Sequence, residues 1–389
     1  MASKLNRFLI SGVVAIVIIT SSFVGFQLDF NSRWRTDRWP KGIPMEHPTH
    51  FSYDDMTYTS PASPVTLEDI VQTLWKPLVT PITDESFVDH NGATQNLGEK
   101  GEQHWMRPLG KKLCIVDIDT RPLSGDHQIF NPGNVAWKDL DMLGSGMLNH
   151  YLYAMIHGYT YHFIKTTPLK DRTAYWTKIP ALASTLSNDR CDITVSIDAD
   201  ASFMNLNLPF EWLLNRWNFT STTSMALALD PIAKVNKDAK HGRTNLNAGF
   251  VVAQNNERTH QILKAWSACP DDQVTYPDCA RWKKKWPAEQ AALSEYIRYK
   301  FTKEEDIKPI ACNDANGYPE SNTECQGTFI QHHWVKKKLV RPAVIESVMS
   351  GLVDRLRTSF VETGIVADAE WEKTSAKTSL RTSKEVRDV

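Results

Sequence analysis

The stretch CDITVSIDADASF, residues 191–203, runs from an apolar segment directly into two aspartates that are separated by one alanine. The short apolar run is typical of a buried β-strand. Asp198 and Asp200 follow at its end, where two carboxylates repel each other unless a cation lies between them. The stretch therefore predicts a buried strand that ends at a cation site.

The segments before this stretch follow an alternating pattern. Strand-like and helix-like runs alternate in the order KLCIVDID (112–119), MLNHYLYAMIHGY (147–159), YHFIK (161–165), YWTKIPALASTL (175–186) and CDITVSID (191–198). This alternation predicts an α/β fold with a largely parallel sheet that is covered by helices on both faces. Ligands of such sheets bind beyond the carboxyl ends of the strands. Two acidic pairs, Asp117/Asp119 and Asp198/Asp200, are predicted at that edge.

The two acidic pairs compete for the role of metal site. IVDIDTR (115–121) resembles the DxDxT signature of phosphoryl-transfer enzymes of the haloacid dehalogenase type, but Arg121 stands where that signature has Thr. A hard divalent cation such as Mn²⁺ takes oxygen ligands and bridges the phosphates of a nucleotide diphosphate. This chemistry favours Asp198 and Asp200. The alternative is that these two residues are solvated acids in a turn.

Length and composition are those of a globular protein. The chain has 389 residues, of which 41% are hydrophobic, enough for one large domain with appendages. Its 44 basic and 45 acidic residues leave a formal net charge of -1. Proteins that bind nucleic acids typically carry a strongly basic surface, so this class is excluded.

The amino terminus has the features of a membrane anchor. FLISGVVAIVIITSSFVGFQL, residues 8–28, contains no charged residue and follows Lys4 and Arg7. As a helix it is long enough to cross a hydrocarbon core of about 30 Å. The alternative is a cleaved signal peptide, whose apolar core is usually about 7–15 residues long and ends at a small-residue cleavage site, which we do not find here. We therefore expect a cytosolic tail at 1–7 and a signal anchor at 8–28.

The rest of the chain divides by composition. Residues 29–110 are rich in Pro, Thr, Asp and His and are expected to form an extended stem, with one amphipathic helix at 66–78 capped by Thr66. The strand and helix pattern occupies 111–350, the predicted α/β domain. After residue 351 the apolar periodicity fades, which predicts a disordered tail at 351–389.

The six cysteines and one sequon bear on the compartment. Two cysteine pairs flank short loops, a spacing that suits local disulfides in an oxidising compartment: Cys269 with Cys279, and Cys312 with Cys325. Cys114 and Cys191 open apolar runs and are expected to be buried thiols. Asn218-Phe219-Thr220 is an N-glycosylation sequon that is usable only in a luminal domain. These features favour the lumen of the secretory pathway over the cytosol.

Six motifs occur together in one order. They are YLYAMIHGYTY (151–161), YWTKIPAL (175–182), SIDADASFMN (196–205), LNAGFVVAQN (246–255), EQAAL (289–293) and FIQHHW (329–334). Over roughly residues 111 to 340 this series resembles the family 34 glycosyltransferases, the galactosyl- and mannosyltransferases of fungi and the xylosyltransferases of plants. The resemblance implies a GT-A fold, a single-pass type II protein of the Golgi membrane with a luminal catalytic domain at 111–350, and retaining transfer from a nucleotide sugar. Its implied partners are a nucleotide-sugar donor, UDP-galactose or GDP-mannose, a glycan or glycoprotein acceptor, and other Golgi transferases.

The resemblance also implies roles for single residues. Asp198, Asp200 and His332 correspond to metal ligands, for which Mn²⁺ is the expected ion, and His333 is the alternative to His332. The implied donor-binding residues are Lys178 near the phosphates and Asn247, Ala248 and Gly249 beside the sugar, while Glu289 and Gln290 lie beneath the anomeric carbon. Asp117 is then expected to contact only the edge of the nucleotide. Two departures from the family pattern, Glu289 for Asp and Gln254 for Arg, predict a different donor pocket.

Other interpretations of the same residues remain. Lys178 would by default be a solvated helix residue, Gly249 a backbone requirement, and Glu289 an acid that complements a helix dipole. Five tryptophans are candidates either for stacking on acceptor sugars or for the core: Trp212, Trp217, Trp282, Trp286 and Trp334. At the level of function the alternatives are an inactive transferase-like membrane protein and a luminal glycoside hydrolase that uses Asp198 and Asp200 as acid and base.

Overall fold

The computed structural model describes residues 64–98, 103–187, 190–319 and 323–363. All of them belong to the unit that begins at Pro64. In these four ranges no helix is both long and apolar enough to cross a membrane. The predicted anchor at 8–28 and the predicted cytosolic tail at 1–7 lie outside the described residues.

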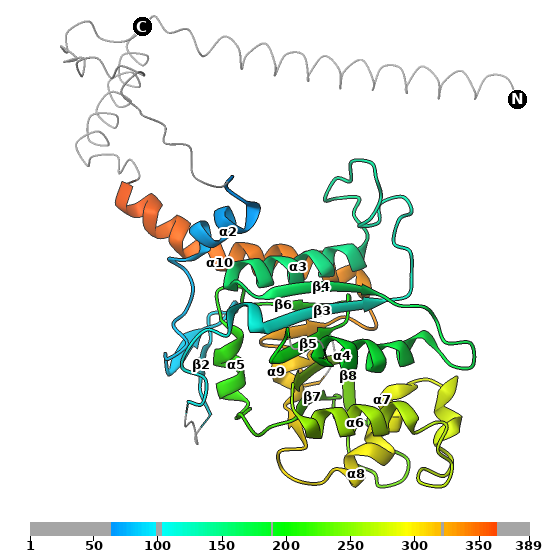
Figure 1. Ribbon diagram of the computed structural model, residues 1–389. Helices are drawn as coiled ribbons and strands as arrows, with labels where there is room; N and C mark the ends of the chain where they lie inside the picture. The colour runs from blue at the N-terminus through cyan, green and yellow to red at the C-terminus, as the bar shows by residue number, and fades with distance from the viewer. Residues whose placement is uncertain (1–63, 99–102, 188–189, 320–322, 364–389) are drawn as a thin grey trace, which may run out of the picture. The chain divides into compact units, whose positions relative to one another are not determined.

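A six-stranded mixed sheet forms the centre of the described domain (Figure 1). Its strands, in spatial order, are β4 (Thr160–Lys165), β3 (Leu113–Asp119), β5 (Ile193–Ile197), β8 (Leu246–Gln254), β7 (Met225–Leu229) and β9 (Ile307–Ile310). The pairs β3–β4, β3–β5 and β7–β9 are parallel, whereas β8 is antiparallel to both β5 and β7. The predicted α/β fold with a mostly parallel sheet is confirmed.

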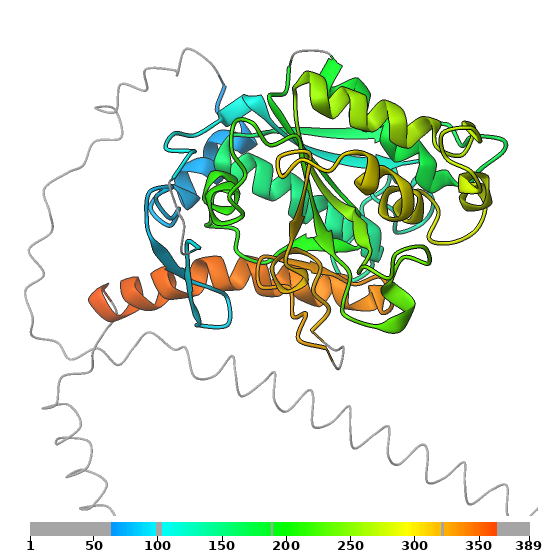
Figure 2. The ribbon, with the colours of Figure 1, turned by 90° about the horizontal axis from the view of Figure 1, so that it is seen from below.

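The helices lie on both faces of this sheet (Figure 1). The main ones are α2 (Leu67–Trp75), α3 (Met142–His157), α4 (Lys178–Ser187), α5 (Phe210–Arg216), α6 (Glu257–Ala268) and α10 (Val340–Thr363). Figure 2 shows α6 and α10 on opposite sides of the sheet. The shorter helical turns are η2 (Gly110–Lys112), η3 (Ala174–Thr177), η4 (Lys234–Asn236), η5 (Cys279–Lys283), α7 (Glu289–Ala292), η6 (Leu293–Ile297), α8 (Arg298–Lys300), α9 (Cys312–Ala315) and η7 (Lys337–Leu339).

The two faces of the sheet bury two separate hydrophobic clusters. In β8, Phe250 and Val252 pack on the face that carries α3 and α5, whereas Val251 and Ala253 pack on the face that carries α4 and α6. Successive side chains of a strand point to opposite faces, so an uninterrupted apolar run is the expected sequence of a strand covered on both sides. This explains why β8 reads as a continuous apolar segment.

The segment 64–98 packs against the domain, in contrast to the extended stem predicted for 29–110. Thr66 caps α2 in a capping box with Asp69, which confirms the predicted helix and its cap. The hairpin of β1 (Ser86–Val88) and β2 (Thr94–Asn96) follows. Trp75 and Phe87 are buried in the core. These two large apolar side chains anchor a polar segment whose composition alone suggested no packing.

Helix α10 extends past the predicted domain end at 350. It continues to Thr363 and therefore into the predicted tail, whose residues 364–389 lie outside the described ranges. Gly351 faces the indole of Trp75, and a Cβ atom at this position would lie 3.5 Å from the Trp75 Nε1 atom. This contact with Trp75 holds the helix at residue 351, whereas most of the residues that follow in α10 are exposed.

All six cysteines form disulfides. The bonds join Cys269 to Cys279 and Cys312 to Cys325, as the loop spacing predicted, and Cys114 to Cys191. The expectation that Cys114 and Cys191 are buried thiols is therefore wrong. Cys114 lies in β3 and Cys191 precedes the neighbouring strand β5, so the pairing of two strands brings together residues that are 77 positions apart.

Candidate active site

A cavity of about 720 Å³ opens at the carboxyl edge of the sheet. All nine predicted site residues line it: Lys178, Asp198, Asp200, Asn247, Ala248, Gly249, Glu289, Gln290 and His332. Asp198 follows the carboxyl end of β5, and Asn247 to Gly249 belong to the start of β8. Because β8 runs antiparallel to β5, its first residues lie at the edge where β5 ends. One reversed strand thus brings the two motifs together.

Asp198, Asp200 and His332 form a three-residue cluster in this cavity. One ligand atom from each residue lies within 4.8 Å of the others. His332 comes from β10 (Ile330–His332), which pairs antiparallel with β6 (Ala201–Phe203) and places His332 directly opposite Ala201. Two carboxylates and an imidazole are suitable ligands for a divalent cation. The donor set fits a metal site.

The structure distinguishes His332 from the neighbouring histidine. His332 Nε2 lies 3.3 Å from Asp200 Oδ1, and the imidazole lines the cavity. His333 is buried and does not line the cavity, although its backbone N–H donates to the Asp200 carbonyl. Consecutive side chains at the end of a strand point in opposite directions, so only one of the two can face the aspartates.

Two lysines neutralise the two aspartates. Lys178 Nζ lies 2.5 Å from Asp198 Oδ1, and Lys337 Nζ lies 2.8 Å from Asp200 Oδ2. Burial alone would raise the pKa of the Asp200 carboxyl, but His332 and Lys337 outweigh burial and hold it below its usual value. Burial would likewise lower the pKa of Lys178, but Asp198 and Glu289 raise it. Lys178 is thus a paired residue of the cavity and not a solvated helix residue.

Gly249 provides the space that His332 occupies. A Cβ atom at Gly249 would lie 2.3 Å from His332 Cε1, which is far inside van der Waals contact. The Gly249 carbonyl also accepts a hydrogen bond from the Asp198 N–H at 2.8 Å. The residue is therefore required for close approach of the histidine to the aspartates, beyond any backbone requirement of its own.

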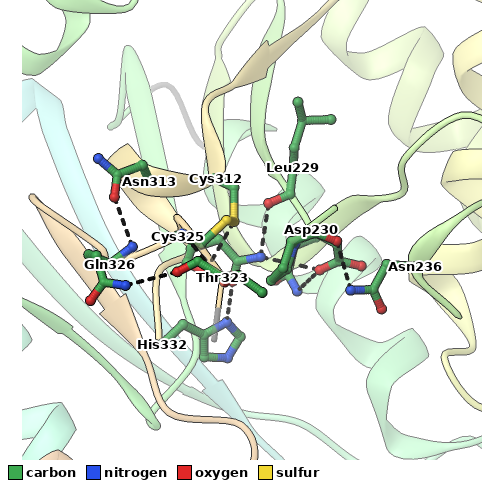
Figure 3. The surroundings of a disulfide bond; sticks show 12 residues. Leu229, Asp230, Asn236, Cys312, Asn313, Thr323, Cys325, Gln326 and His332 are labelled. Carbon is green, nitrogen blue, oxygen red and sulfur yellow. Dashed lines mark hydrogen bonds between the residues drawn. A yellow bond between two sulfur atoms is a disulfide. The ribbon is translucent and has the colours of Figure 1, made fainter. Parts of the chain in front are cut away.

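The orientation of His332 is set by Asn316, which bonds to both His332 and Asp230. Figure 3 shows His332 and Asp230 in the surroundings of the Cys312–Cys325 disulfide. Asn316 Nδ2 donates to the Leu229 carbonyl at 3.1 Å and to Asp230 Oδ1 at 3.2 Å, so Asn316 Oδ1 is left as the acceptor that faces His332 Nδ1 at 2.9 Å. His332 therefore carries a proton on Nδ1, and Nε2 faces the aspartates, where it can bind a metal ion once it carries no proton.

Glu289 is a buried carboxyl group with an incomplete set of partners. It is 3% exposed, lines the cavity, and its Oε2 atom makes no hydrogen bond within the described residues. Burial raises its pKa to about 7, although the nearby Lys178 opposes the shift. Glu289 is also an acid in the first turn of α7, as the alternative interpretation predicted, and the helical run continues through η6 and α8. The residue in addition lines the cavity.

Gln290 completes the cavity wall that begins with Asn247–Gly249. Its Oε1 atom accepts a hydrogen bond from the Ala248 N–H at 3.0 Å. Asn247 Nδ2 donates to Asp230 Oδ1 at 2.8 Å, and Asn247 Oδ1 accepts from the Gly249 N–H at 2.7 Å. The turn Asn247–Gly249 and Gln290 are thereby held as one rigid wall of the cavity.

The first acidic pair is divided between the core and the cavity. Asp117 is 1% exposed, does not line the cavity, and is bonded to His150 Nδ1 at 2.9 Å and to Tyr161 Oη at 2.8 Å. The expectation that it contacts the edge of a nucleotide is not supported. Asp119 does line the cavity, with Arg121 Nε 2.9 Å from its Oδ1 atom. Burial would raise the pKa of Asp119, but hydrogen bonds from Arg121 lower it.

Gln254 lies away from the cavity. It is the last residue of β8 and pairs with Ile193 at the start of β5, at the edge of the sheet opposite to Asp198. Its Nε2 atom donates to the Ser221 carbonyl. Gln254 therefore does not line the cavity, and the prediction that it changes the donor pocket gains no support, because a nine-residue strand separates it from Asn247–Gly249.

Three residues that contact His332, Asp200 or the cavity wall carry no prediction from the sequence. Asp230, Asn316 and Lys337 were not predicted. Asp230 had a usable signal, since it follows the apolar run MALAL (225–229) as Asp198 follows its own strand. Asn316 and Lys337 lie in segments without a comparable pattern, and only the fold brings them to His332 and Asp200.

Comparisons with known proteins identify the family of this chain. Residues 129–342 match the sequence profile of the galactosyl transferase GMA12/MNN10 family, glycosyltransferase family 34. A solved structure, described as the crystal structure of a glycosyltransferase involved in the glycosylation of the major capsid of PBCV-1, is similar over 60% of this chain and 98% of its own, with 13% identity and a TM-score of 0.42. No curated protein matched. Because the family profile spans more than half of the chain and contains the cavity motifs, the protein belongs to the galactosyl transferase GMA12/MNN10 family and is a glycosyltransferase.

Proposed function

We propose that this protein is a GT-A glycosyltransferase that moves a hexose from UDP-galactose or GDP-mannose to a glycan or glycoprotein acceptor, with Mn²⁺ and with retention of the anomeric configuration. One observation carries the proposal. The carboxylates of Asp198 and Asp200 and the imidazole of His332 converge in the cavity that also holds Lys178 and Glu289. A nucleotide-diphospho-sugar needs these groups together: positive charge for its phosphates and a polar wall for its sugar.

The chain's own residues stabilise the leaving group. In this proposal Asp198, Asp200 and His332 hold Mn²⁺, which when bound supplies positive charge against the diphosphate. Lys178 and Lys337 already lie beside the two aspartates and add fixed charge at the same place. Preorganised charge of this kind stabilises the negative charge that develops as the bond to the anomeric carbon breaks.

The wall formed by Asn247–Gly249, Glu289 and Gln290 is the basis of the proposed stereochemistry. Asn247, Ala248 and Gly249 contact the donor sugar, and Glu289 and Gln290 lie on the face of the ring that is opposite to the leaving group. The acceptor hydroxyl then attacks from the side that the diphosphate leaves. In its ionised form the Glu289 carboxylate would place negative charge beneath the cationic sugar, and its raised pKa of about 7 makes this ionisation depend on pH near neutrality.

We also propose a luminal location in the Golgi, with the segment 8–28 as a type II signal anchor and other Golgi transferases as partners. Two observations support a luminal domain. All six cysteines are paired, which is rare in the cytosol, and Asn218 of the sequon is exposed. Protease protection of intact microsomes tests the topology: digestion of residues 64–363 without detergent would contradict it.

A screen of donor hydrolysis tests the proposed reaction. The full-length protein is incubated with UDP-galactose, GDP-mannose and other nucleotide sugars, with Mn²⁺ or with a chelator. We expect release of the nucleotide diphosphate from one donor, loss of this activity with the chelator, and recovery when Mn²⁺ is added back. Chelator-insensitive cleavage of a glycoside would favour the hydrolase, and no turnover of any donor would favour an inactive transferase-like protein.

A further inference from the structure

A second, smaller cavity of about 90 Å³ adjoins the main one. The two share five lining residues: Asp230, Asn236, Trp286, Pro287 and Gln290. The main cavity runs from Asp119 and Arg121, at the end of β3, past the aspartates to the wall at Gln290. The small cavity therefore continues the site beyond the position of the donor sugar, on the side away from the proposed nucleotide.

The five tryptophans that were candidates for sugar stacking separate in the structure. Trp212, Trp217 and Trp282 are buried, although Trp282 also lines the small cavity. Trp334 is half-buried and lines the main cavity. Trp286 is 69% exposed and lines both cavities, and Val235, which is 84% exposed, lines the small cavity. An exposed indole costs free energy in water, and a ring stacked on it would remove that apolar surface from solvent. Trp286 is thus an open apolar platform at the junction of the two cavities.

Asn245 supplies a polar group for which the fold provides no partner. Its side chain is 7% exposed and lines the small cavity, and its Oδ1 atom makes no hydrogen bond within the described residues. A buried amide oxygen without a partner destabilises the fold, and a hydrogen bond from a hydroxyl group in the cavity would offset this cost. The Asn245 backbone, in contrast, is fully engaged with Asn236 and Asp230.

The charge of the lining selects the kind of sugar. Asp230, Asp238 and Glu295 line the small cavity, and Lys237 is its one lysine among the described residues. A carboxylated or phosphorylated sugar would meet net negative charge, whereas a neutral sugar would not. A neutral pyranose also matches the two other features, since its C–H face is apolar and its edge carries hydroxyl groups.

We propose that Trp286, Val235 and Asn245 form an acceptor subsite for a neutral oligosaccharide, in which one pyranose ring stacks on Trp286 and donates a hydroxyl hydrogen bond to Asn245 Oδ1. The inference rests on the proposed glycosyl transfer, because it assigns the space beyond the donor sugar to the acceptor. It adds that the acceptor is recognised at least one ring away from the reacting hydroxyl. A chain of sugars is then preferred to a monosaccharide.

The test is binding, which requires no turnover. Mannotriose, galactotriose and cellotriose serve as probes for the full-length protein, by saturation-transfer difference NMR and isothermal titration calorimetry. We expect at least one trisaccharide to bind more tightly than its monosaccharide. Trp286→Ala and Asn245→Ala should each raise the Kd by about tenfold, which corresponds to about 1.4 kcal/mol, and Trp286→Tyr should bind more tightly than Trp286→Ala because its ring still stacks.

Trp137→Ala is the matched control, since Trp137 is also exposed but lines neither cavity, and its Kd should equal that of the wild type. Circular dichroism confirms the fold of each variant. Equal trisaccharide binding by Trp286→Ala and wild type, or no binding of any probe by the wild type, would overturn the subsite. Trisaccharide binding that depends on Trp286, together with no turnover of any nucleotide sugar, would support the subsite and contradict the proposed transfer.

Discussion

The carboxylate of Asp230 accepts a hydrogen bond from the side-chain amide of Gln290 at 2.8 Å. The same carboxylate accepts from Asn247 and from Asn316, and Asn316 orients His332. Asp230 therefore connects the cavity wall at Asn247 and Gln290 to His332 through three side-chain amides. Side chains that orient metal ligands in this way are typically worth about 10–100-fold in metal affinity or activity.

Asp230→Asn is expected to weaken both glycosyl transfer and Mn²⁺ binding. The amide keeps the shape but replaces one acceptor oxygen by a donor, so at least one of the three amides loses its partner. We expect transfer and Mn²⁺ affinity, the latter measured by calorimetry, each to fall by about 10–100-fold. Asp126→Asn, at an exposed carboxylate, is the control. Unchanged Mn²⁺ affinity in a folded Asp230→Asn protein would argue against the coupling.

Asp200→Asn and Asp117→Asn should separate catalysis from stability. Loss of the negative charge at Asp200 removes a stabiliser of the metal shell, and transfer should fall by about 10²–10³-fold over a Mn²⁺ titration. Asp117 bonds only to His150 and Tyr161 in the core, so its amide variant should keep measurable activity and lose about 1–3 kcal/mol of unfolding free energy. A folded Asp117→Asn enzyme without activity, beside an active Asp200→Asn enzyme, would place the metal at the first acidic pair.

Glu289 should make stability depend on pH between its ordinary pKa of 4.5 and its raised value of about 7. The folded state holds this proton more tightly than the unfolded state, so the unfolding free energy falls as pH rises through this window. The cost is fully present above about pH 7. Glu289→Gln should remove this cost. Its gain in unfolding free energy over wild type should therefore be about 3 kcal/mol larger at pH 8 than at pH 4.5. Denaturant unfolding at both pH values measures the difference, with the exposed Glu304→Gln as control.

Gly249→Ala should inactivate the enzyme by displacing His332. The added Cβ atom would lie 2.3 Å from the imidazole, and a displacement of about 1 Å in an active site can cost about 10²-fold in rate. Gly98→Ala is a suitable comparison, because its Cβ atom would meet its nearest neighbour, the Arg216 carbonyl, at an ordinary 3.7 Å. Wild-type transfer by Gly249→Ala would show that His332 need not approach the aspartates so closely.

The disulfide at Cys312 should affect the metal site as well as stability. It closes a separation of 13 residues that includes Asn316, whereas the Cys269–Cys279 bond closes 10 residues away from His332. Replacing either pair by serine should cost about 3 kcal/mol. Only the Cys312→Ser, Cys325→Ser variant should also lose Mn²⁺ affinity, measured by calorimetry below its unfolding temperature. Equal Mn²⁺ affinity in the two double variants would show that the loop does not hold His332.

Local patterns in the sequence determined the elements and the main motifs of this protein. Apolar runs such as CDITVSID predicted buried strands because a strand covered on both faces needs apolar residues at successive positions. The same runs placed Asp198 and Asp200 at a strand end, where ligands of parallel sheets bind. Thr66 predicted the start of α2, since its side chain accepts a hydrogen bond from a backbone N–H that the helix leaves free.

The tertiary structure alone decided which distant residues meet. His332 was separated from His333 by the pairing of β10 with β6, and Cys114 was joined to Cys191 by the pairing of β3 with β5. The fold also decided that Asp230, Asn316 and Trp286 lie at the cavity or beside His332. A local pattern encodes the direction and burial of a side chain along its own element, whereas a site depends on the register and direction of segments that are far apart in the chain.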